Sequence, residues 1–154
     1  MKPRDEVTAD GPNNLKERKV YKWLFRAAAA LSGLGLIAHE LLGAPSVLKP
    51  LATTTLPEEV IWLHHFSWHV GTVATAAMVS MFIFASMRSN QLPMAIVATA
   101  MSLGFAALGI ALALGQGSAL WQTPAPYLWS LVAAVGCLGI WAALATNPAR
   151  EQLD

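Results

Sequence analysis

Four long apolar blocks, separated by short polar breaks, dominate the sequence. They cover about 23–42, 58–87, 92–114 and 127–146. An α-helix needs about 20 mainly apolar residues to cross the hydrocarbon core of a bilayer, and each block reaches that length. The pattern therefore predicts an all-α fold, an integral membrane bundle of four transmembrane helices.

The polar segments delimit one membrane domain over residues 22–147. We expect residues 1–21 to form a polar N-terminal tail, in which the segment Gly11-Pro12-Asn13-Asn14 breaks any early helix. Residues 148–154 form a second short tail after the fourth helix. No internal repeat interrupts this organisation, so the chain is expected to fold as a single bundle.

The break between the first two apolar blocks contains the clearest signals for a loop and for the start of a helix. Pro45 and Pro50 predict a loop after the first helix. Thr55, Pro57 and Glu58 then supply a capping hydroxyl, an early proline and an acid, as at the start of a helix. Because the second block is longer than one span requires, either its first turns stand above the hydrocarbon or the helix tilts.

Composition agrees with a membrane protein and excludes several other classes. Hydrophobic residues make up 55% of the 154 residues, charged residues only 12%, and the mean hydropathy is +0.48. A water-soluble domain carries about 25% charged residues. The net charge of +1 gives no electrostatic case for binding nucleic acid. With one cysteine, Cys137, the chain forms no internal disulfide.

The basic residues predict the orientation in the membrane. Nine of the ten lie in segments that share one side of the predicted bundle, namely Lys2, Arg4, Lys16, Arg18, Lys19, Lys22, Arg26, Arg88 and Arg150. Only Lys49 falls on the other side. Because cytoplasmic segments carry the excess of lysine and arginine, we expect both termini to be cytoplasmic. The expected location is a bacterial inner membrane or a plasma membrane, with the lipid bilayer as the main partner.

A group of ionisable side chains marks the outer ends of the first two helices. All four histidines, His39, His64, His65 and His69, fall there together with Glu40. Counted from the cytoplasmic ends, His39 and His69 lie at similar depths, and sequential antiparallel helices are usually neighbours. We therefore expect His39 and His69 to converge inside the bundle, with His65 and Glu40 close by.

These residue types suggest a metal or cofactor site. His65 and His69 are one helical turn apart and can bind one metal ion together, so His39, His65, His69 and Glu40 are candidate ligands of a transition metal. His39 and His69 are also candidate axial ligands of a haem. Glu40 can instead orient a histidine or accept a proton. The simpler interpretation is that these side chains are hydrated at the membrane interface.

Three classes of function stay open at this stage. The first is a metal- or haem-binding membrane redox protein or small oxidoreductase. The second is a non-catalytic accessory or assembly subunit with a protein partner, or a homo-oligomer. The third is a small transporter, which the scarcity of polar residues at mid-depth disfavours. The sequence assigns no catalytic residue and does not decide whether the chain is an enzyme.

The predicted topology can be tested by cysteine accessibility. Single cysteines introduced as Asp10→Cys and Ser89→Cys should be shielded from an impermeant thiol reagent added outside the cell, because both positions are expected to be cytoplasmic. A cysteine introduced as Ala119→Cys should react. Labelling of the first two positions from outside would overturn the orientation.

Overall fold

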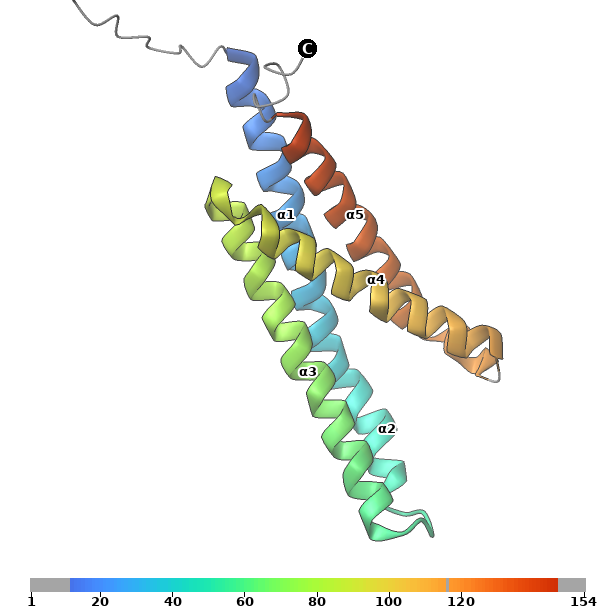
Figure 1. Cartoon of the computed structure of the whole chain (residues 1–154). Helices are drawn as coiled ribbons and strands as arrows, with labels where there is room; N and C mark the ends of the chain where they lie inside the picture. Colours follow the sequence, from blue (N-terminus) through green and yellow to red (C-terminus); the bar gives the residue numbers. More distant parts are fainter. Residues whose placement is uncertain (1–11, 116, 147–154) are drawn as a thin grey trace, which may run out of the picture.

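The computed structural model describes residues 12–115 and 117–146, and every element in this part of the chain is helical (Figure 1). The elements in chain order are α1 (Pro12–Ala38), η1 (His39–Gly43), α2 (Ala44–Leu51), α3 (Glu58–Met87), η2 (Ser89–Gln91), α4 (Leu92–Gly115), η3 (Ser118–Gln122) and α5 (Ala125–Ala145). The element η1 is a π-helix, and η2 and η3 are 3₁₀-helices.

Four segments are long and apolar enough to cross a membrane, Val20–Leu51, Glu58–Met87, Leu92–Gly115 and Ala125–Ala145. Such length and composition fit the hydrocarbon core, where only helices or closed barrels satisfy the backbone. The predicted all-α, four-helix transmembrane fold is confirmed. Of the two predicted polar tails, residues 1–11 and 147–154 lie outside the described residues.

The first span differs from the expectation at both ends. α1 begins at Pro12, so the break expected over Gly11-Pro12-Asn13-Asn14 is wrong from Pro12 onward, while Gly11 lies outside the described residues. The fixed φ of Pro12 suits the first helical position. The loop expected at Pro45 and Pro50 is also wrong. The chain stays helical through η1 and α2 to Leu51, with Pro45 in the first turn of α2, directly after the π-helix η1.

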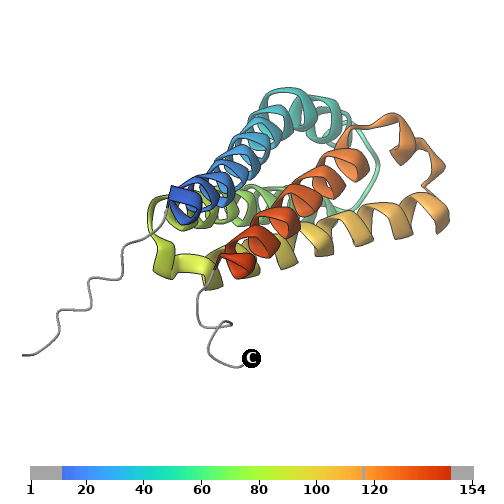
Figure 2. The same ribbon diagram turned by 90° about the horizontal axis from the view of Figure 1, so that it is seen from above.

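The helices pack as two antiparallel pairs (Figures 1 and 2). α1 lies along α3 and also against α5, and α5 packs along α4. The contact between α4 and α3 extends over fewer residues than these three contacts. As Figure 1 shows, the α4–α5 pair diverges from the α1–α3 pair, so that α2 and the start of α3 project away from the other two helices.

The core lies where the four helices are closest together. Phe25, Met78, Phe82 and Val132 are completely or almost completely buried, and the rings of Phe25 and Phe82 stack with centroids 6.4 Å apart. Gly139 of α5 lies directly against the Phe25 ring. Small residues at such contacts let helix backbones approach closely, which is how helices associate in lipid.

Gly139→Ala is expected to weaken the bundle. A Cβ at position 139 would lie 2.5 Å from Cε1 of Phe25, whose buried ring has no room to move, and overpacking of this kind costs about 1–3 kcal/mol. The control is Gly104→Ala on α4, where a Cβ meets nothing within 4 Å and alanine favours the helix. Thermal unfolding in detergent measures both variants, and equal stabilities would contradict the proposed close contact.

Candidate functional site

The candidate site begins where α1 passes into the π-helix η1. In this turn backbone N–H groups bond five residues back, as the N–H of Ala44 does to the carbonyl of His39. Pro45 follows, and a proline ring crowds the carbonyl four residues earlier in a regular α-helix. The wider π turn accommodates the ring without ending the helix. It also places both His39 and Glu40 beside α3.

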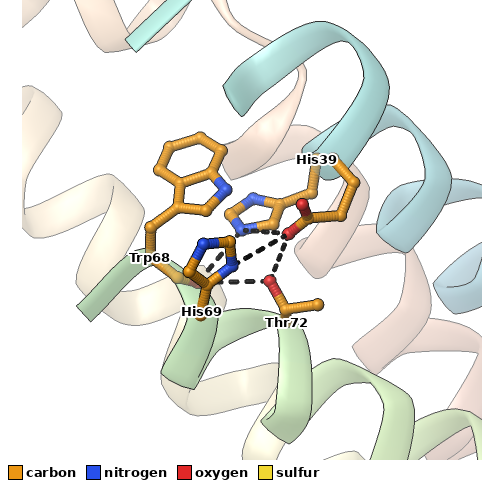
Figure 3. Close-up of polar contacts among 5 residues, drawn as sticks. His39, Trp68, His69 and Thr72 are labelled. Carbon is orange, nitrogen blue, oxygen red and sulfur yellow. Dashed lines mark hydrogen bonds and ion pairs between the residues drawn. The ribbon is translucent and has the colours of Figure 1, made fainter. Parts of the chain in front are cut away.

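His39 is held by Trp68 of α3. The imidazole and indole rings stack almost in parallel, with centroids 3.9 Å apart and an interplanar angle of 7° (Figure 3). Nε2 of His39 lies 3.3 Å from the carbonyl oxygen of Trp68, a distance at which a protonated Nε2 donates a hydrogen bond. A Cβ at Gly71 would lie 3.8 Å from this Nε2. The ring therefore packs directly over the α3 backbone.

Gly43, at the end of η1, packs against the ring of Trp68. A Cβ at this position would lie 2.9 Å from the Trp68 ring, so only glycine lets the indole approach η1 this closely. Trp68 is partly buried, and its Nε1 is buried without a hydrogen-bond partner among the described residues. Because the indole N–H makes no hydrogen bond there, packing against Gly43 and the stack with His39 hold the ring in place.

Glu40 lies at the centre of the polar contacts. Its Oε1 accepts a hydrogen bond from the hydroxyl of Thr72. The same oxygen lies 3.9 Å from Nε2 of His39 and 3.9 Å from Nδ1 of His69, which is beyond hydrogen-bond length but close enough for attraction between opposite charges. The side chains of Glu40 and His39 are about one-third exposed, at 33% and 32%, whereas that of His69 is 58% exposed. His69 is thus the open side of the site.

We call His39, Glu40, His69 and Thr72 the His–Glu cluster. The structure brings together three of the four candidate ligands around one carboxylate oxygen. His65 contacts a different side chain, the indole of Trp62, with ring centroids 5.3 Å apart. The fourth histidine, His64, is exposed, and its Nδ1 lies 3.0 Å from the carbonyl of Val60.

Sequence reasoning gave no role in the site to Trp68, Gly43 and Gly71. Trp68 was not among the candidate residues predicted from the sequence. Trp68 and Thr72 are four residues apart, which places both on one face of α3. This spacing is a signal that could have assigned Trp68 to the same site as Thr72. Gly43 lies one helical turn after His39, which places both on one helix face, whereas Gly71 gave no signal of this kind.

The arrangement is not that of a preassembled metal centre. Within residues 12–115 and 117–146, no group of three or more His, Cys, Asp or Glu side chains is placed to hold a metal ion. Nε2 of His39 is directed at a carbonyl and a carboxylate oxygen, as suits a donor. The metal-ligand prediction for His39, Glu40, His65 and His69, and the haem prediction for His39 and His69, stay predictions.

Thr72→Val is expected to destabilise the α1–α3 pair. Valine keeps the shape of threonine but removes the hydroxyl that donates to Glu40, and loss of such a hydrogen bond costs about 1 kcal/mol. Thr72→Ser should retain most of the stability. Ser80→Ala on the same helix is the control, since its hydroxyl bonds only to the carbonyl of Ala76. If Thr72→Val unfolds thermally like Ser80→Ala, the contact with Glu40 contributes nothing.

Comparison with known proteins gives no relative from which a function could be transferred. No family model, no curated protein and no solved structure matches the chain. A fold by itself does not define a function, which depends on the side chains of a site. The function is therefore argued from the His–Glu cluster.

Proposed function

We propose that the chain is a proton-coupled membrane protein that takes up and releases a proton at the His–Glu cluster. One observation carries the proposal. A single carboxylate oxygen, Oε1 of Glu40, faces the hydroxyl of Thr72 and nitrogens of both His39 and His69. A carboxylate beside two imidazoles can share a proton with either ring, because imidazole changes charge between about pH 5 and 8.

Each member of the cluster has a distinct role in this proposal. The carboxylate of Glu40, held in place by the hydroxyl of Thr72, faces both imidazoles and attracts the proton to them. His69, more than half exposed, exchanges protons with the aqueous side. His39 is held in place by the Trp68 carbonyl and by its stack on the indole ring.

The position of the cluster supports a functional role over a purely structural one. Glu40 is the only acid in the first membrane-spanning segment, Val20–Leu51. An ionisable side chain within a span is costly and usually marks a functional site. A carboxylate that served packing alone could be replaced by its neutral isostere glutamine without loss. The test of the proposal uses this difference.

Infrared difference spectra between pH 8 and pH 5, recorded on the protein in vesicles, test proton uptake by the cluster. The wild type should show the ring band of protonated imidazole, and Glu40→Gln should weaken it, because glutamine removes the negative charge that faces His39 and His69. Glu59→Gln is the matched control, because it removes an exposed acid from the start of α3. The band should persist in this control. An unchanged band in Glu40→Gln would refute uptake by the cluster.

Proton coupling itself needs a second measurement on the same vesicles. With a pH gradient applied and a pH-sensitive dye inside, the wild type and Glu59→Gln should show proton movement that Glu40→Gln abolishes. Equal movement in all three proteins would refute the coupled activity. The interior of the bundle is filled by Phe25, Met78 and Phe82, so any transfer across it requires a change in helix packing.

The predicted metal or haem protein is tested on the same samples. A haem gives a Soret band, and a bound metal appears in elemental analysis. Either finding, if lost in both His39→Ala and His69→Ala while the fold persists, would assign the cluster to the predicted redox protein and replace the proposal of proton exchange. The predictions of an accessory subunit, a protein partner or a homo-oligomer stay predictions.

A further inference from the structure

We infer that Lys22, Trp23 and Arg26, here named the basic collar, bind the phosphate group of an acidic phospholipid. The guanidinium carbon of Arg26 lies 5.0 Å from the centroid of the Trp23 ring, in a cation–π contact. Trp23 is 65% exposed and Arg26 is exposed as well. This inference is independent of the proposed function, since the collar lies at the opposite end of α1 from the His–Glu cluster.

The collar faces away from the bundle. On the same stretch of α1, Tyr21 and Phe25 are buried, at 6% and 1% exposure, and belong to the hydrophobic core. Lys22 and Arg26 are one turn apart on the other side of the helix, with Trp23 beside them. A planar guanidinium and an ammonium group held at this spacing suit the oxygens of one phosphate.

Charge is distributed unevenly between the two ends of the bundle. Phe25 stacks on Phe82, so Arg88, exposed just after α3, lies at the same end as the collar. Glu40, Glu58 and Glu59 lie toward the other end, whereas Glu17 of α1 lies on the collar's side, among the basic residues Lys16, Arg18 and Lys19. The collar therefore lies in a region of positive potential, which attracts anionic headgroups.

Exposed aromatic rings indicate that the collar lies at the boundary of the bilayer. Gly139 of α5 lies against Phe25, which places Trp141, 71% exposed, near the level of Trp23. Two exposed tryptophans at one level are typical of the headgroup region. A soluble anion has no need of such rings, so the structure favours a lipid as the source of the phosphate.

The lipids retained by the protein test this inference. After equilibration in nanodiscs that hold equal amounts of phosphatidylglycerol and phosphatidylcholine, native mass spectrometry measures the bound ratio. The wild type should retain mainly phosphatidylglycerol. Arg26→Gln should lower the ratio about fivefold, because each basic residue near the surface contributes about 1 kcal/mol. Lys49→Gln, which removes an exposed lysine at the other end, should leave the ratio unchanged.

Two further measurements on the wild-type protein test the inference without any variant. In the wild type, about 1 M salt should abolish the preference for phosphatidylglycerol, because salt screens exposed charges. Inorganic phosphate at millimolar concentration should not displace the retained lipid. The inference fails if Arg26→Gln keeps the wild-type ratio, if the preference survives high salt, or if free phosphate displaces phosphatidylglycerol.

Discussion

The backbone of a chain that crosses hydrocarbon must satisfy its own hydrogen bonds, since no water is present to do so. Pro45 removes one donor from the first span. The chain remains helical there, and the bonding pattern widens into the π turn His39–Gly43. The hydroxyl of Ser46 also satisfies a backbone group of this turn, because it donates a hydrogen bond to the carbonyl of Leu42 at 2.7 Å. The site depends on this local adjustment, which sets His39 and Glu40 beside α3 and brings Gly43 against Trp68.

The helical fold could be predicted because hydrophobic length and the scarcity of charge are properties of composition. The end of the first span could not. Prolines at 45 and 50 ordinarily predict a loop, and the sequence alone does not show that a π turn accommodates the first of them. The second lies in the last turn of α2. There the hydroxyls of Thr53 and Thr54 bond to the carbonyls of Pro50 and Leu51.

The candidate site was predictable only in its ionisable residues. Histidines and an acid beside apolar helices are conspicuous, and the antiparallel arrangement of the first two spans accounts for the meeting of His39 with His69. The spacing of His65 and His69 predicts a shared ligand role, which stays a prediction, and the ring of His65 contacts that of Trp62. The parts that orient the site, the stack on Trp68 and the close approach at Gly43, depend on three-dimensional packing that no spacing rule describes.

The divergence of the two helix pairs explains why the cluster is accessible at all. Gly35 lies against Leu128, near the start of α5, and this contact is one helical turn before His39. Beyond it α1 continues through η1 and α2 with α3 as its neighbour, while the α4–α5 pair turns away (Figure 1). If α5 stayed in contact with α1 along its whole length, α5 could cover Glu40 and His69. The Gly35 contact thus marks the place where the packed core ends and the polar site between η1 and α3 begins.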